Sequence, residues 1–129
     1  KLVNNYQVNN LIVESQDIIN RKLNIYADSE ALKDATSNYI MITNNGDATR
    51  YRILLDYYSP AENDIRASIN GFIIKDLCNY NKDNNSYILY EGPISEKETE
   101  SNIIKLWIKK GSNNAYDNKF KFKLRIEEI

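Results

Sequence analysis

Apolar and polar residues alternate one by one near the C-terminus of the chain. The apolar positions are Phe120, Phe122, Leu124 and Ile126, and the polar positions are Lys119, Lys121, Lys123, Arg125 and Glu127. Side chains of a β-strand point alternately to its two faces, whereas those of an α-helix repeat about every 3.6 residues. The pattern therefore predicts a strand with one buried face and one face in water.

The same alternation recurs upstream in shorter stretches. The clearer ones span residues 104–108, 51–55 and 22–26, and the weaker ones span 39–43, 69–74 and 87–90. Polar turn-forming segments lie between them, and Asn45-Gly46 in one of these is typical of a tight hairpin turn. Short strands with regular turns predict an all-β fold, an antiparallel β-sandwich of jelly-roll or immunoglobulin-like type. We expect a single domain over residues 1–129.

Two short stretches favour helix. Residues 29–35 combine a candidate N-cap, Ser29, with good helix formers, and residues 62–68 form a similar segment. Each is only about two turns long. The sequence thus predicts one or two short helices beside the strands.

The chain contains no histidine. This absence excludes Ser-His-Asp and Cys-His catalysis, and also histidine-ligated zinc. The glycines are isolated, so the sequence has no glycine-rich phosphate-binding loop. The formal net charge is -1, which gives no overall attraction to nucleic acid or anionic membranes. We therefore expect a protein that is not an enzyme, with no catalytic residue, cofactor, metal site or small-molecule substrate.

The single cysteine, Cys78, cannot form an internal disulfide. It follows Leu77 in an apolar run, so we expect a buried and unreactive thiol. No apolar stretch reaches the roughly 18 residues that a membrane-spanning helix needs. Since the chain begins at Lys1, we expect a processed protein from which a signal peptide or anchor has been removed.

Cations gather between residues 105 and 125, where Asp117 is the only acidic residue. If residues 104–109 and 119–127 pair as a hairpin around the polar loop 111–118, one basic face results. Its members are Lys105, Trp107, Lys109, Lys119, Lys121, Lys123 and Arg125. Such a face would suit a glycan or an anionic cell-wall polymer. Alternatively, the lysines keep an exposed sheet face soluble and prevent edge-to-edge aggregation.

The N-terminal segment, residues 1–13, also has strand character. Leu2, Tyr6 and Val8 lie on one alternating face, and asparagines and a glutamine separate them. Two arrangements are open: the segment pairs within its own sheet, or it is an arm that adds to the sheet of a neighbouring copy. In the second case Leu2, Tyr6 and Val8 form an assembly strand, and the backbone supplies the affinity.

Several stretches together resemble a known family. Residues 42–46, Ile-Thr-Asn-Asn-Gly, precede the strand 51–55, and residues 103–108 contain a leucine-tryptophan strand. Residues 118–126 form a closing strand after an asparagine-rich loop. In this order they resemble the TasA/camelysin family of secreted Firmicute surface proteins, over about half of the chain.

This resemblance implies a secreted sandwich protein that builds extracellular fibres or a biofilm matrix through N-terminal strand donation. We therefore expect an extracellular or cell-surface structural protein whose partner is a second copy of itself. The metalloprotease activity described for some family members does not carry over, because this chain has neither histidine nor an HExxH motif. The alternative is a surface or phage-type binding module for a glycan or an anionic cell-wall polymer.

Overall fold

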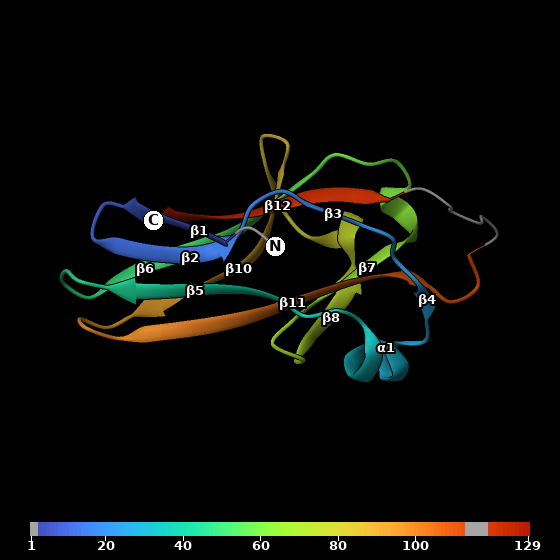
Figure 1. Cartoon of the computed structure of the whole chain (residues 1–129), viewed down its shortest axis with the longest axis horizontal. Helices are drawn as coiled ribbons and strands as arrows, with labels where there is room; N and C mark the ends of the chain where they lie inside the picture. The colour runs from blue at the N-terminus through green and yellow to red at the C-terminus, as the bar shows by residue number, and fades with distance from the viewer. Residues whose placement is uncertain (1–2, 113–118) are drawn as a thin grey trace.

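Two β-sheets stacked face to face make up the protein (Figure 1). The computed structural model describes residues 3–112 and 119–129. A large sheet has seven strands and a small sheet has five. Neighbouring strands run antiparallel, except that β4 (Ile25–Tyr26) pairs in parallel with β11 (Thr99–Lys109). The prediction of an antiparallel β-sandwich is confirmed.

The order of strands places four of them at sheet edges. In space, the large sheet runs β1 (Val3–Val8), β2 (Leu11–Gln16), β5 (Asn38–Asn44), β11, β7 (Ile65–Ile69), β8 (Ile73–Asp76), with β4 beside β11. The small sheet runs β3 (Ile19–Arg21), β12 (Phe120–Glu128), β6 (Thr49–Tyr57), β10 (Ser86–Ile94), β9 (Lys82–Asp83). The edges are therefore β1 and β8 in the large sheet, and β3 and β9 in the small one.

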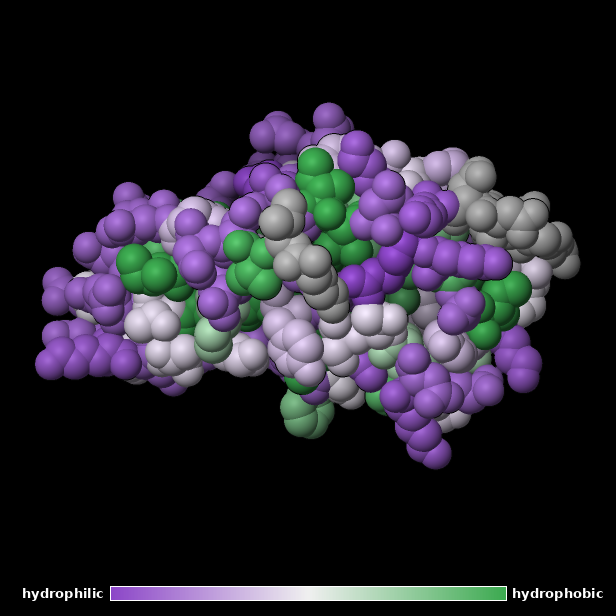
Figure 2. All heavy atoms as spheres, in the orientation of Figure 1, coloured by the Kyte–Doolittle hydropathy of each residue, from purple (hydrophilic) through white to green (hydrophobic). Residues whose placement is uncertain are grey.

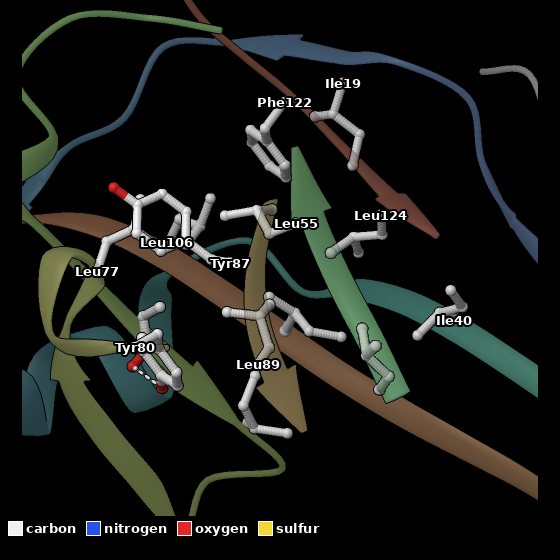
Figure 3. Close-up of a cluster of buried hydrophobic side chains, with 14 of the residues drawn as sticks. Ile19, Ile40, Leu55, Leu77, Tyr80, Tyr87, Leu89, Leu106, Phe122 and Leu124 are labelled. Atoms are coloured by element: carbon white, nitrogen blue, oxygen red, sulfur yellow. Dashed lines mark hydrogen bonds between the residues drawn. The ribbon is translucent and has the colours of Figure 1, made fainter. Parts of the chain in front are cut away.

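The hydrophobic core lies between the two sheets. Alternate residues of β12 point inward, and Phe120, Phe122, Leu124 and Ile126 are all buried, as the alternation predicts. Figure 3 shows Leu55 of β6, Leu89 of β10 and Leu106 of β11 pointing into the same interior space. One continuous cluster of buried residues draws members from both sheets.

A buried polar bridge joins the sheets across this core. The hydroxyl of Tyr51 on β6 donates to Glu100 Oε1 at 2.6 Å, and Asn102 Nδ2 donates to the same hydroxyl at 3.1 Å. Burial is the main cause that raises the pKa of Tyr51, and its hydrogen bond to Glu100 adds to this. The phenol therefore stays protonated and keeps donating at any ordinary pH.

One short α-helix forms in the described part of the chain, within the prediction of one or two short helices. Helix α1 (Asp28–Asp34) falls on the first predicted segment and packs over the outer face of the large sheet, at the lower right of Figure 1. The second segment, 62–68, begins as a 3-10 turn, η1 (Glu62–Asp64), and continues as β7. Buried Ile65, Ala67 and Ile69 follow the period of a strand, so that helix prediction is wrong. A further 3-10 turn, η2 (Leu77–Asn79), follows β8.

Two predicted hairpins do not form, because the chain crosses between sheets at both places. Strands β11 and β12 lie in different sheets, so the loop 111–118 does not close a hairpin. Residues 113–118 of that loop lie outside the described residues. Strands β5 and β6 also lie in different sheets. Gly46, between β5 and β6, packs closely against the side chain of Asn10. A Cβ at this position would lie 2.6 Å from the side-chain nitrogen Nδ2 of Asn10.

Candidate functional site

Strand β1 forms one edge of the large sheet and pairs along its full length with β2. The register runs without a bulge from Val3 opposite Gln16 to Val8 opposite Leu11. In this structure the N-terminal segment therefore pairs within its own sheet, the first of the two arrangements left open by the sequence. Its other side, the free edge of β1, has no partner strand among the described residues.

Two of the three side chains predicted to form an assembly strand pack against the core of their own chain. Tyr6 and Val8 lie on the inner face of β1, where both pack partly buried against the core of their own chain. Leu2 lies outside the described residues. The inner side chains thus anchor β1 to its own sandwich, so the part of this strand that remains open to a partner is its backbone edge.

The turn between β1 and β2 determines which backbone groups face that free edge. Val8 and Leu11 flank a two-residue turn, in which Asn9 adopts a φ of 53°. The residues that flank such a turn exchange hydrogen bonds with each other, and successive pairs then alternate. The N–H groups of Asn5 and Gln7 consequently point away from β2. These two residues are candidate positions for strand pairing that the sequence did not single out.

The free edge of β1 differs in chemistry from the other sheet edges. Its six residues, VNNYQV, contain no charge and no proline. The edge strand β8 ends in Lys75 and Asp76, and β9 consists only of Lys82 and Asp83. Strand β3 has three residues and ends in Arg21. Short length and charge are devices that prevent edge pairing, so among the described strands β1 is the long edge without them.

The β1–β2 turn is fastened to the rest of the molecule. Asn9 Nδ2 donates to Glu128 Oε1 at 2.7 Å, and the hydroxyl of Thr49 donates to Glu128 Oε2 at 2.5 Å. These two hydrogen bonds hold the pKa of Glu128 below its usual range. The backbone N–H of Asn45 also donates to the carbonyl of Asn10 at 2.9 Å. These contacts attach the β1–β2 turn to β12 and to the segment between β5 and β6.

A groove of about 400 Å³ opens between β1 and β12, at the side of the sandwich next to the free edge. Asn4 and Tyr6 line one wall, and Lys123 and Arg125 line the other. Burial raises the pKa of Tyr6. The groove therefore presents a neutral phenol opposite two cations.

The predicted basic face is split between the two sheets. Lys105, Trp107 and Lys109 lie on β11 in the large sheet, whereas Lys121, Lys123 and Arg125 lie on β12 in the small sheet, with Lys119 just before it. The two groups lie on opposite outer faces of the sandwich. The prediction of one basic face is therefore wrong, because alternation identifies a strand's exposed side but not the sheet to which it belongs.

Trp107 does point outward from β11, but helix α1 covers it. Its side chain is 0% exposed and packs with Ala31 and Ala35 of the helix. The lysines beside it are also engaged: Lys105 Nζ donates to the Leu32 carbonyl at 2.7 Å, and Lys109 Nζ lies 3.6 Å from Asp76. Trp107 is thus a structural residue that no ligand could stack against.

The two arginines on the outer face of the small sheet are paired with carboxylates. Arg125 Nε donates to Asp56 Oδ2 at 2.7 Å, and Ser86 bonds to both of these side chains. Arg52 lies 2.6 Å from Glu91 and 3.3 Å from Glu127. This mixed network fits the alternative prediction, in which charges keep an exposed sheet face soluble.

Cys78 is exposed, contrary to the prediction of a buried thiol. It lies in the 3-10 turn η2, where Leu77 turns into the core and Cys78 turns out. Among residues 3–112 and 119–129, no group of three or more cysteine or acidic side chains is placed to hold a metal ion. Nor does any described helix have the length and apolar character needed to cross a membrane.

The fold and this edge define the class: a two-layer antiparallel β-sandwich with an uncharged, exposed edge strand. No protein-family model and no curated protein matches the chain. A solved structure similar to it is the secreted serine protease VesC from Vibrio cholerae, at 12% identity and a TM-score of 0.28. The alignment covers 95% of this chain and 22% of that protein. A likeness this weak supports no functional argument, and the resemblance to the TasA/camelysin family stays a prediction.

Proposed function

We propose that this protein is a non-enzymatic structural protein that assembles with copies of itself by β-strand addition, as a subunit of an extracellular fibre or matrix. The observation that carries the proposal is the free edge of β1, six residues long and without charge. An exposed edge of this kind is a template for another strand. The extracellular or cell-surface location is part of the proposal and rests on the family resemblance.

Addition at the edge is favoured over donation of the strand. Donation would require β1 to leave β2, expose Tyr6 and Val8, and break the contacts that Asn9 makes with Glu128. Addition at the edge leaves all of these in place and uses only backbone groups that face outward already. The assembly surface is therefore the outward N–H and C=O groups along β1.

A fibre also needs a second, different surface, because a contact between two identical edges closes into a pair. The opposite edge of the large sheet supplies one at the apolar start of β8, because its charged residues, Lys75 and Asp76, lie at the other end of that strand. Phe72, directly before β8, is 88% exposed, and Ile73 at the start of β8 is 42% exposed. Val3 on β1 is 54% exposed. Joining β1 of one copy to β8 of the next continues the large sheet and covers these apolar side chains.

Two variants test this arrangement. Asn5→Lys places a charge on the β1 edge, and Asn5→Thr is its uncharged control at the same position. Phe72→Lys changes only the β8 edge. In sedimentation velocity, we expect wild type and Asn5→Thr to form a concentration-dependent series of oligomers, whereas Asn5→Lys and Phe72→Lys each stay monomeric.

Mixing the two charged variants gives the sharper result. Each keeps the edge that the other has lost, so the mixture should form a 1:1 heterodimer that does not grow further. If Phe72→Lys alone forms dimers, β1 pairs with β1 and the assembly is closed. If Asn5→Lys assembles like the wild type, strand addition at β1 is wrong.

The alternative function was a glycan or anionic-polymer module that binds through the basic face, and the structure contains no such face within residues 3–112 and 119–129. Trp107 is buried, and the cations lie on two opposite faces. No observation on the described residues favours binding of an anionic polymer at that place.

A further inference from the structure

The outer face of the large sheet carries almost no charge where β1, β2, β5 and the first part of β11 form it, whereas Arg66, Lys105 and Lys109 lie further along the same face. At the outward positions of β1, β2, β5 and the first part of β11, Glu14 is the only charged residue. In Figure 2, green and white residues lie at the left of centre and below it, and purple residues lie to the left, above and to the right of them. The outer face of the small sheet carries Arg52, Asp56 and Arg125 among other charges. A need for solubility would favour charges on both outer faces, so it does not explain why this part of the large sheet has so few.

Two hollows lie on this outer face. One of about 310 Å³ is lined by Gln16, Tyr39, Met41 and Ser101 among others. A second of about 240 Å³ includes Ile103, which pairs in register with Tyr39. The two hollows therefore lie next to each other, and we refer to them together as the trough. They cross the strands β2, β5, β11 and β7, whose three spacings of about 4.8 Å span about 14 Å.

Tyr39 lines the first hollow, and its side chain is 55% exposed. A tyrosine presents a flat apolar ring and a hydroxyl that can donate and accept hydrogen bonds. Around it the trough offers hydroxyl and amide groups of Ser101, Ser68 and Asn70. Glu14 also lines the first hollow and Lys105 the second, where its Nζ donates to the Leu32 carbonyl. An aromatic ring beside hydroxyl and amide groups matches a ligand that has both C–H faces and hydroxyl groups.

Gln16 adds an independent observation. Its side-chain oxygen is buried, and no donor in residues 3–112 or 119–129 reaches it. Buried acceptors are normally paired, so an unpaired one requires an explanation. The last torsion of a glutamine side chain is broad, so the amide can turn toward the hollow that it lines. A ligand hydroxyl there would supply the missing donor.

We propose that this trough binds a neutral saccharide, with a sugar ring stacked on Tyr39 and its hydroxyls hydrogen-bonded by Gln16 and Ser101. The absence of positive charge around the first hollow disfavours an anionic polymer, because nothing there would balance its charge. The polar lining and the open shape disfavour a lipid chain. Strand addition uses the edges of the sheet, and Val3 belongs both to the β1 edge and to the lining of the first hollow, whereas Gln16, Tyr39 and Ser101 lie away from that edge.

Affinity electrophoresis in native gels tests the proposal. The gels contain dextran, galactomannan, xyloglucan or mixed-linkage β-glucan, with polygalacturonate as the anionic comparison. We expect at least one neutral polysaccharide to retard the protein, and Tyr39→Ala to weaken this binding about tenfold or more. Tyr39→Phe should keep most of it, and Gln16→Ala should reduce it. Tyr58→Ala is the matched control, since Tyr58 is equally exposed at 55% elsewhere on the molecule.

Several outcomes would overturn the proposal. They are no retardation by any of the four neutral polysaccharides, strongest retardation by polygalacturonate, or equal losses in Tyr39→Ala and Tyr58→Ala. A Tyr39→Ala chain that changes its sedimentation would instead show that a second copy covers this face. The same gels with the Phe72→Lys variant separate retardation by sugar from slow migration of assembled protein, so failure here is distinct from failure of strand addition.

Discussion

Asp56 is the centre of a charged cluster on the outer face of the small sheet. It accepts hydrogen bonds from Arg125 and Ser86, and both partners lie on the neighbouring strands β12 and β10. Burial alone would raise the pKa of this carboxyl, but the hydrogen bonds from Arg125 and Ser86 outweigh it and hold the pKa below its usual value. The cluster therefore ties three strands together through an ionised group.

This cluster predicts how stability depends on acid. A carboxyl whose pKa is lower in the folded state contributes stability above its unfolded pKa and loses it as the pH falls through the folded one. We expect the free energy of unfolding, from urea titrations, to fall between about pH 5 and pH 2. Asp56→Asn should make this decline shallower, and the same change at exposed Asp34 controls for the loss of one carboxyl. A slope unchanged by Asp56→Asn would contradict the assignment.

The burial of single residues could be predicted where apolar and polar residues alternate strictly, but not where this alternation is interrupted. The inward positions of β12 follow directly from the sequence because every second residue is apolar. Cys78 could not be placed in this way, since an apolar neighbour does not reveal a 3-10 turn. The uncharged edge of β1 is visible in the sequence as residues 3–8, but only the sheet order shows that it is an edge.

At the scale of elements, helix α1 is held to the large sheet mainly by Trp107. This side chain is fully buried with Ala31 and Ala35, and Tyr26 and Ile74 pack against the same small cluster. The cluster is separate from the main core, so the helix has few other apolar contacts. Removing the indole would leave a cavity that the two alanines cannot fill.

Trp107→Ala should lower the free energy of unfolding by about 3–5 kcal/mol, as is typical for large aromatic residues in cores. Urea titration measures this, and Trp107→Phe should cost less because it fills part of the space. Trp107 is the single tryptophan, so native fluorescence reports on it alone. We expect that fluorescence to resist quenching by iodide. Ready quenching, or a loss below about 1 kcal/mol, would show that α1 does not cover this side chain.

The position of elements within the sheets was the part that the sequence did not determine. The strands 104–108 and 119–127 were both predicted correctly as strands, yet they lie in different sheets. The alternation of apolar and polar residues indicates only which side of a strand is buried. Strands of both sheets bury one side in the same core, so the pattern does not show to which sheet a strand belongs. The pairing depends on long-range contacts, such as that of β11 with β7, which leave no local pattern.

At the scale of the whole molecule, the two outer faces and the edges divide the surface by chemistry. The small sheet presents paired charges, the large sheet presents a trough lined mainly by uncharged residues, and β1 presents an uncharged edge. In the proposed assembly, copies continue the large sheet edge to edge, and its outer face remains open along the fibre. Each repeat would then present one saccharide trough, so binding to a polysaccharide would gain from many linked sites.

Hydrogen exchange of the backbone amides of Asn5 and Gln7, measured by NMR across a range of protein concentrations, tests strand addition most directly. These N–H groups face solvent in a single copy and become hydrogen-bonded when a strand adds to β1, which slows their exchange. We expect their protection to rise with concentration, while amides along the edge strand β3 remain unchanged. Oligomers that form without any added protection at Asn5 and Gln7 would contradict the account.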